Sequence, residues 1–171
     1  MLGDAREQPA LAKLMAAEPK RTAAECEELG GDGCGDPEAL AKKRVEEMTR
    51  HGKRLEAAKA CGADAGCWAK KLEDADKGVV ERAALEVGRG KAGAHVGALL
   101  ARMTEKDANA RQALILGAEW LVEDSKEAAT QARSALPTLE KQLTEEKGRT
   151  EFSLVNEDLR RLVARIQRQK T

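Results

Sequence analysis

The sequence predicts an all-helical fold built from stacked helix pairs, and three observations lead to this prediction. The chain has 171 residues, enough for one domain with a substantial core. Aromatic residues make up 2%, while Ala, Leu, Glu, Lys and Arg, which favour helices, dominate. A pattern in residues 72–88 returns, 31 positions later, in residues 103–117. A coiled coil repeats every seven residues, so this longer period is typical of helix pairs that stack to bury their apolar faces.

The N-terminal segment 4–30 is expected to form a short helical hairpin. Pro9 and Pro19 each suit the first turn of a helix, because the fixed φ of proline matches that position. The glycine-rich stretch 30–35 follows and is typical of a linker. The sequence thus predicts two parts, an N-terminal hairpin with its linker and a repeat domain, at residues 1–35 and 36–171.

The repeat domain is expected to hold four helix pairs. Asp36 before Pro37 is a typical helix start, with a capping side chain followed by proline. The pairs are predicted at 37–50 with 53–61, 67–73 with 77–88, 91–103 with 107–122, and 126–144 with 151–169. The segment 88–93 superficially resembles a phosphate-binding loop. It lacks the preceding strand and the Gly-Lys-Ser/Thr ending, so we interpret it as a turn between repeats.

The last predicted helix has the clearest periodicity in the chain. One face is apolar, with Leu154, Val155, Leu159, Leu162, Val163 and Ile166. The other face carries most of the arginines, Arg160, Arg161, Arg165 and Arg168. Such a face is usually solvated surface, and it is also a candidate for contact with an anionic partner or surface.

The segments 72–88 and 103–117 resemble HEAT repeats, especially the HEAT-like type of phycobilisome lyases. Asp76 and Asp107 match the loop aspartate of the motif, and Ala110-Arg111 resembles its valine-arginine step. The segment 135–143 resembles the first helix of a HEAT unit, including its proline. The resemblance implies a right-handed α-solenoid of antiparallel helix pairs, an alpha-alpha superhelix preceded here by the N-terminal hairpin.

HEAT proteins are mostly scaffolds and adaptors, and the fold does not decide the activity. The resemblance therefore implies a non-catalytic module that binds a protein or peptide along one face. An alternative is a nucleic-acid-binding HEAT protein, similar to a glycosylase, that uses the terminal arginines. A lyase acting on a tetrapyrrole rests on the repeat type alone.

The four cysteines form two close pairs, Cys26 with Cys34 and Cys61 with Cys67. Each pair straddles a predicted turn, so local disulfides are the simplest of three possible connectivities. Each short loop would gain roughly 2 kcal/mol or less from its crosslink. Disulfides would indicate an oxidising compartment such as the periplasm or cell surface, whereas reduced cysteines would indicate the cytoplasm. Spacings of seven and five residues within the pairs are wider than zinc ligands usually have.

The remaining features predict no cofactor, metal or small-molecule substrate. His51 and His95 are the only histidines, and neither lies in a catalytic motif. Thirty basic and thirty acidic residues cancel, whereas nucleic-acid binders usually carry a basic excess. No stretch is long and apolar enough for a membrane span, and no secretory signal is visible at the start, although the chain could be a fragment of a longer protein.

These observations predict an extracytoplasmic interaction module that is not an enzyme. Trp68 is expected in the core, while an exposed Trp120 would be a binding hot spot. The candidate partner-binding residues are Arg111, Trp120, Arg160, Arg161, Arg165 and Arg168.

Overall fold

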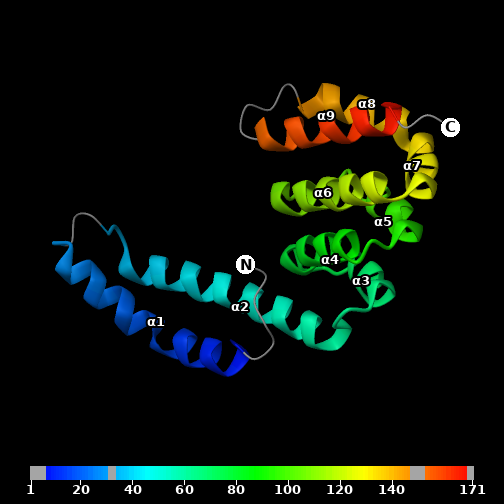
Figure 1. Cartoon of the computed structure of the whole chain (residues 1–171). Helices are drawn as coiled ribbons and strands as arrows, with labels where there is room; N and C mark the ends of the chain where they lie inside the picture. The colour runs from blue at the N-terminus through cyan, green and yellow to red at the C-terminus, as the bar shows by residue number, and fades with distance from the viewer. Residues whose placement is uncertain (1–6, 31–33, 147–152, 169–171) are drawn as a thin grey trace. The chain divides into compact units, whose positions relative to one another are not determined.

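The computed structural model describes residues 7–30, 34–146 and 153–168, and every regular element in these ranges is helical (Figure 1). The predicted all-helical class is thus confirmed. Contacts divide the chain into two compact units, Met1–Ala60 (unit 1) and Cys61–Thr171 (unit 2), so the boundary expected at residue 35 falls inside unit 1. The helices are α1 (Gln8–Glu28), α2 (Pro37–Cys61), α3 (Ala65–Lys71), α4 (Lys77–Arg89), α5 (Val96–Leu100), α6 (Ala108–Asp124), α7 (Lys126–Ala132), α8 (Leu136–Glu146) and α9 (Ser153–Arg168), with 3₁₀ turns η2 (Gly93–His95) and η3 (Arg133–Ala135).

In the described part of unit 1, residues 7–30 and 34–60, there are two long helices where the sequence predicts two shorter pairs. The prediction of a break at Pro19 is wrong, because α1 continues through it. The turn expected between 50 and 53 is also absent, since α2 runs through Gly52. A glycine inside a helix costs about 1 kcal/mol relative to alanine but does not end the helix. Here the bare face of Gly52 admits Leu11, whose Cδ2 would lie 3.4 Å from an added Cβ.

A buried charged cluster joins α1 to α2. The Glu18 side chain is fully buried, and its carboxylate accepts hydrogen bonds from Arg21, Thr22 and Arg44 at 2.9 to 3.1 Å. Burial alone would raise the pKa of Glu18, but the hydrogen bonds from these three residues lower it below 4.5. Arg44 also donates to the Thr22 hydroxyl. These contacts lie on both sides of Pro19, which explains why the helix continues past it.

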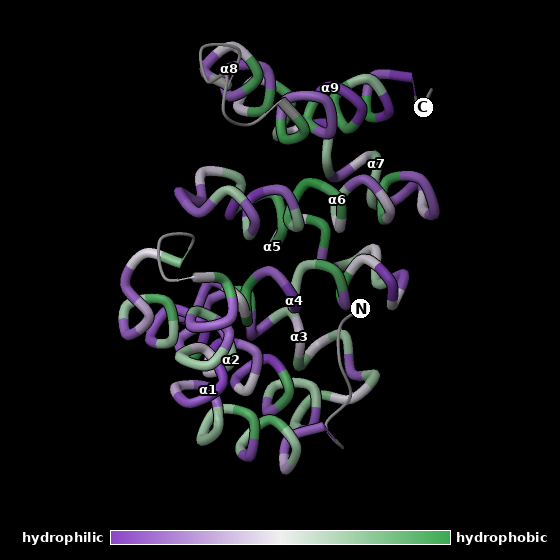
Figure 2. The backbone as a smooth tube through the Cα atoms, turned by 90° about the vertical axis from the view of Figure 1, so that its left-hand side faces the viewer, coloured by the Kyte–Doolittle hydropathy of each residue, from purple (hydrophilic) through white to green (hydrophobic). Residues whose placement is uncertain are grey.

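Unit 2 is a stack of helices with α6 at its centre. α4 packs on one side of α6 and α9 on the other, while α3 packs on α4 and α5 on α6 (Figure 1). Apolar residues recur along α6 where it lies between its neighbours (Figure 2). Its fully buried side chains include Leu114, Ile115 and Leu121. The apolar face predicted for α9 is confirmed by its buried residues Val155, Leu159, Leu162, Val163 and Ile166, while Leu154 is exposed.

The two glycines that close the repeated segments bring α4 and α6 into close contact. A Cβ added to Gly117 would lie 2.4 Å from the Ala84 carbonyl oxygen, and one added to Gly88 would lie 2.8 Å from the Gly117 Cα. Real Cβ atoms do not approach other atoms so closely, so both positions need glycine. The glycines at the ends of the two repeated segments are therefore the residues at which α4 and α6 cross with their backbones in contact.

Side-chain caps define the starts of α4 and α6. The Asp76 carboxylate accepts from the backbone N–H groups of Gly78 and Val79, and the Asp107 carboxylate accepts from that of Ala110. Such caps contribute about 1 kcal/mol each. The loop aspartates of the repeat are therefore N-caps, and the helices predicted at 67–73, 77–88 and 107–122 are confirmed to within a few residues.

Two predicted helices are shorter or divided. The helix expected at 91–103 is reduced to η2 and α5. The helix expected at 126–144 contains η3, which precedes Pro137. Proline has no N–H to bond the carbonyl four residues earlier, so the backbone tightens to a 3₁₀ turn before continuing as α8. The start of the expected hairpin at residue 4, linker residues 31–33 and the ends of the last helix at 151, 152 and 169 lie outside the described residues.

Candidate functional site

Two disulfides close short loops, one in each unit. Cys26 pairs with Cys34 at a Cα–Cα distance of 5.4 Å, and Cys61 pairs with Cys67 at 5.3 Å. The local connectivity predicted from the sequence is therefore present, and no cysteine is free. The second disulfide lies beside Trp68, which is 2% exposed, as expected of a core residue.

Trp68 is fixed from two sides. Its indole Nε1–H donates to the Gly62 carbonyl oxygen at 2.9 Å, across the loop that the second disulfide closes. The Arg82 guanidinium lies 5.7 Å from the centre of its ring, within reach of a cation–π interaction. Both groups are used inside unit 2, so neither is a surface contact for a partner.

Arg111, a candidate partner contact, is buried instead. It is 5% exposed, and its Nη1 donates to the Glu105 carbonyl oxygen at 2.6 Å. Its position follows from the Asp107 cap, because the first turn of α6 directs the arginine back onto the loop that precedes it. Arg111 thus stabilises the turn between α5 and α6.

The Glu105 side chain joins neighbouring elements of unit 2. Its carboxylate accepts from Lys77 of α4 and from Arg102, both at 2.9 Å, and from two backbone N–H groups. Arg102 also donates to the Leu72 carbonyl oxygen at 2.7 Å. Burial would raise the pKa of Glu105, but the hydrogen bonds from Lys77, Arg102 and the backbone lower it to about 2. These charges hold α4 and the residue Leu72 before it against the segment between α5 and α6.

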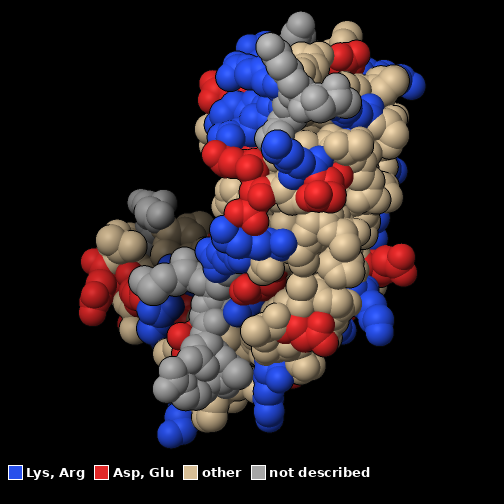
Figure 3. Space-filling view, turned by 45° about the vertical axis from the view of Figure 1, so that its right-hand side comes forward, with Lys and Arg blue, Asp and Glu red and all other residues tan. Residues whose placement is uncertain are grey.

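A second charged network fixes α9 on α6. Glu119 is 3% exposed, and its carboxylate accepts from Arg161 at 3.1 Å and from Arg165 at 2.8 Å. Arg161 also bonds Asp158, which in turn accepts from Gln112 of α6 at 2.9 Å. Figure 3 shows acidic and basic side chains interleaved on this part of the surface. Two of the four candidate arginines of α9 are therefore committed to internal pairs.

Arg160 and Arg168, the other two candidates on α9, are exposed. Neither has a hydrogen bond or ion pair to the residues that the structure describes. They remain available to an anionic partner, but two separate surface arginines do not by themselves make a site.

Trp120 lies in a surface pocket at the ends of α4 and α6. The pocket has a volume of about 420 Å³ and is lined by Gly88, Arg89, Lys91, Trp120, Glu123 and Asp124. The indole packs over Gly88, where an added Cβ would lie 2.8 Å from its Cε3. Lys91 and Asp124 form an ion pair at 2.6 Å beside it. The site is thus a partly exposed aromatic surface with a charged rim.

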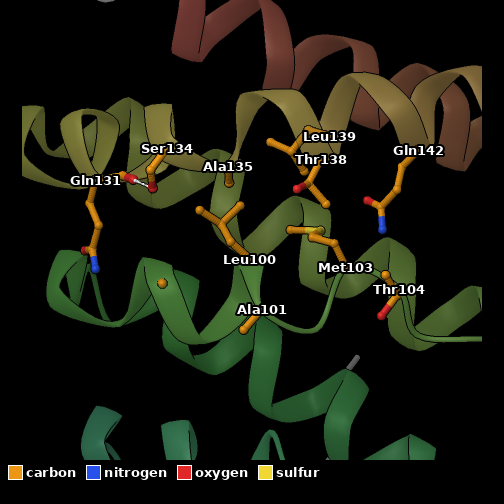
Figure 4. A pocket seen from close by; sticks show the side chains of 11 residues that line it. Leu100, Ala101, Met103, Thr104, Gln131, Ser134, Ala135, Thr138, Leu139 and Gln142 are labelled. Carbon is orange, nitrogen blue, oxygen red and sulfur yellow. Dashed lines mark hydrogen bonds between the residues drawn. The ribbon is translucent and has the colours of Figure 1, made fainter.

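A second pocket, which sequence reasoning missed, lies between α5 and the run from α7 to α8. It has a volume of about 380 Å³, and all of its lining residues are uncharged (Figure 4). In Figure 3 an uncharged area covers this side of unit 2 at mid-height. These residues are neutral and form no motif. The only sequence signal for the pocket was their spacing on one helix face, at positions 131, 134, 135, 138, 139 and 142.

No family model matches the chain. No curated protein or solved structure shows significant similarity to it either. The resemblance to HEAT repeats therefore rests on the residues of the chain alone.

The two histidines lie in different units. His51 lies on α2 with its Nε2 3.6 Å from the Glu7 carboxylate, and His95 ends η2 beside a shallow pocket that Asp64 and Glu73 also line. Within the described ranges, no cluster of three His, Cys, Asp or Glu side chains has metal-binding geometry. None of the described helices combines the length and apolar character needed to cross a membrane.

Proposed function

We propose that this protein is a non-catalytic interaction module that binds a partner protein or peptide on a face of unit 2. The observation that carries the proposal is Trp120, a large aromatic side chain partly exposed in a pocket with a charged rim. Tryptophan is the side chain most enriched among residues that dominate binding energy, and such residues lie in pockets with polar surroundings. The indole would anchor the partner, and Arg89 and Glu123 would orient it.

We further propose that unit 2 is an α-solenoid of HEAT-like helix pairs. The equivalence of α4 and α6 supports this, since both begin at an aspartate cap and touch at glycine. The buried Leu72 and Met103, which lie 31 residues apart, add a further equivalent position. In such a stack each repeat contacts its neighbours, and the outer faces remain available for binding.

The proposed compartment is extracytoplasmic, either the periplasm or the cell surface. Two disulfides support it, because cytosolic thiols are kept reduced. A thiol titration of the protein isolated from its own cells, under denaturing and non-reducing conditions, tests this proposal. We expect no reactive thiol. Four reactive thiols would instead indicate the cytoplasm.

Site-specific photo-crosslinking tests the interaction. A photoreactive amino acid replaces Trp120 in one variant and Lys106 in another, since Lys106 is exposed just before the start of α6 and Trp120 lies near the other end of that helix. We expect position 120 to capture one protein, which protease removes and nuclease does not. Equal capture at both positions, or capture of nucleic acid, would contradict the proposal. The nucleic-acid outcome would favour the alternative function through Arg160 and Arg168.

A further inference from the structure

The pocket between α5 and α8 has an apolar floor. Met103 and Leu139 are each 1% exposed, and Leu100 lies beside them (Figure 4). Ala101 and Ala135 complete the apolar lining. A floor of this kind accepts small apolar side chains, and the volume of about 380 Å³ lies at the lower end of the range for ligand pockets.

The rim of this pocket carries neutral hydrogen-bonding groups, most of them exposed to solvent. The side chains of Gln131, Gln142, Thr104 and Thr138 line the pocket, and none has a hydrogen-bond partner in the part of the chain that the structure describes. In Figure 4, Gln131 and Gln142 stand at the two ends. A glutamine amide both donates and accepts, and can therefore pair with a peptide unit, which offers one N–H and one C=O.

The spacing of these amides sets the length of a ligand. Gln131 lies on α7 and Gln142 lies eleven residues later on α8, with the 3₁₀ turn η3 between the two helices. A straight helix of eleven residues is about 16 Å long, a distance that an extended chain covers in about five residues. Side chains of an extended chain alternate, so every second one would face the floor.

The absence of charge restricts the ligand further. Charged residues make up 35% of the chain, yet the eleven lining residues include none. A charged side chain buried there would lose its hydration without gaining a partner. Phosphate groups, acidic peptides and nucleic acid are therefore poor ligands for this pocket.

We propose that the pocket between α5 and α8 binds an extended, uncharged peptide segment of about five residues, with Gln131 and Gln142 pairing with its backbone. This inference rests on the proposed interaction function and specifies one ligand surface for it. The peptide would alternate small apolar side chains, facing Leu100 and Met103, with Ser or Thr side chains facing solvent.

The test uses fluorescence anisotropy with the full chain and a labelled probe, acetyl-Ser-Val-Thr-Ala-Ser-amide. Affinity should rise from about three to five residues and then level off, as the span between the amides requires. Gln142→Ala and Gln131→Ala should each weaken binding about tenfold, because each removes roughly one to two hydrogen bonds. Lys141→Ala is the matched control, since this side chain is 78% exposed and does not line the pocket. It should leave the affinity unchanged.

A probe with Asp in place of Val should bind at least about tenfold more weakly. The inference is overturned if this charged probe binds as tightly or if both glutamine variants bind like the wild type. It is also overturned if maltopentaose, an uncharged sugar, competes fully with the peptide.

Helix content of each variant is measured by circular dichroism. Gly97→Ala provides a second variant that disturbs the site, because its Cβ would lie 2.9 Å from the Gln131 amide nitrogen. If position 120 still crosslinks to a partner protein but the peptide probe does not bind, this inference is refuted and the proposed function is not.

Discussion

Replacing Gly117 by alanine tests whether the backbones of α4 and α6 touch as the structure shows. The new Cβ would lie 2.4 Å from the Ala84 carbonyl oxygen and 3.1 Å from the Ala84 carbonyl carbon. Neither atom belongs to a side chain that could rotate away. The helices must therefore separate by about 1 Å to restore an ordinary contact.

The cost of this separation can be estimated. Overpacking a tight interior costs about 1–3 kcal/mol, and a clash with backbone belongs at the upper end of that range. Alanine gains about 1 kcal/mol over glycine inside a helix, which offsets part of the cost. We expect a net loss of about 2 kcal/mol in the free energy of unfolding of unit 2, or roughly 8 °C in its melting temperature.

The assay is urea unfolding followed by circular dichroism, with Gly97→Ala as the control. A Cβ at Gly97 would meet the end of the flexible Gln131 side chain at 2.9 Å, which can move aside. This variant should therefore be nearly neutral or slightly more stable than the wild type. If Gly117→Ala proves as stable as Gly97→Ala, α4 and α6 do not cross at this glycine.

Three further predictions concern the charges and the disulfide of unit 2. Because its pKa is lowered to about 2, Glu105 stabilises the fold above pH 4.5 and loses this effect as the pH falls. The pKa difference corresponds to at most roughly 3 kcal/mol, and partial exposure of its lysine partner reduces this. Glu105→Gln should cost about 1–2 kcal/mol and flatten the dependence of stability on acidic pH, measured by urea unfolding, and an unchanged pH profile would contradict this. Glu119→Gln should raise amide hydrogen exchange in α9 by about tenfold, whereas Glu123→Gln, at a 57% exposed side chain, should change it little. The double variant of Cys61 and Cys67 to serine should lose about 2 kcal/mol or less, and reductant should then have no further effect on the melting of unit 2, because the remaining disulfide, Cys26–Cys34, lies in unit 1.

Much of unit 2 could be predicted because its signals are local. Asp76 and Asp107 cap helices through their own side chains, so the cap is readable from the adjacent sequence. The disulfides close loops of a few residues, which makes local pairing the simplest choice. The helices of unit 1 were harder to predict. A proline such as Pro19 normally breaks a helix, but here contacts of the buried Glu18 on both sides of the proline hold α1 together.

The candidate site was predicted less well, because partners distant in the sequence decide what is exposed. Arg161 and Arg165 form a regular polar face in the sequence, but Glu119, more than forty residues earlier, binds both. Arg111 looks like a surface charge until the loop before α6 folds over it. The pocket at Trp120 could not be predicted from neighbouring residues, because it depends on Gly88, which the crossing of α4 and α6 brings beneath the indole.

The same contacts that stabilise unit 2 also determine its binding surfaces. The Glu105 and Glu119 networks pair charged side chains between neighbouring elements of unit 2, while the residues that line the pocket between α5 and α8 are all uncharged. The glycine contact fixes α4 on α6, and α6 in turn supports α5 and α9, against which α8 packs. The floor residues Met103 and Leu139 are therefore held by packed helices and not by loops. A ligand entering a preformed pocket pays little to order the protein, so a few neutral hydrogen bonds can suffice for selective binding.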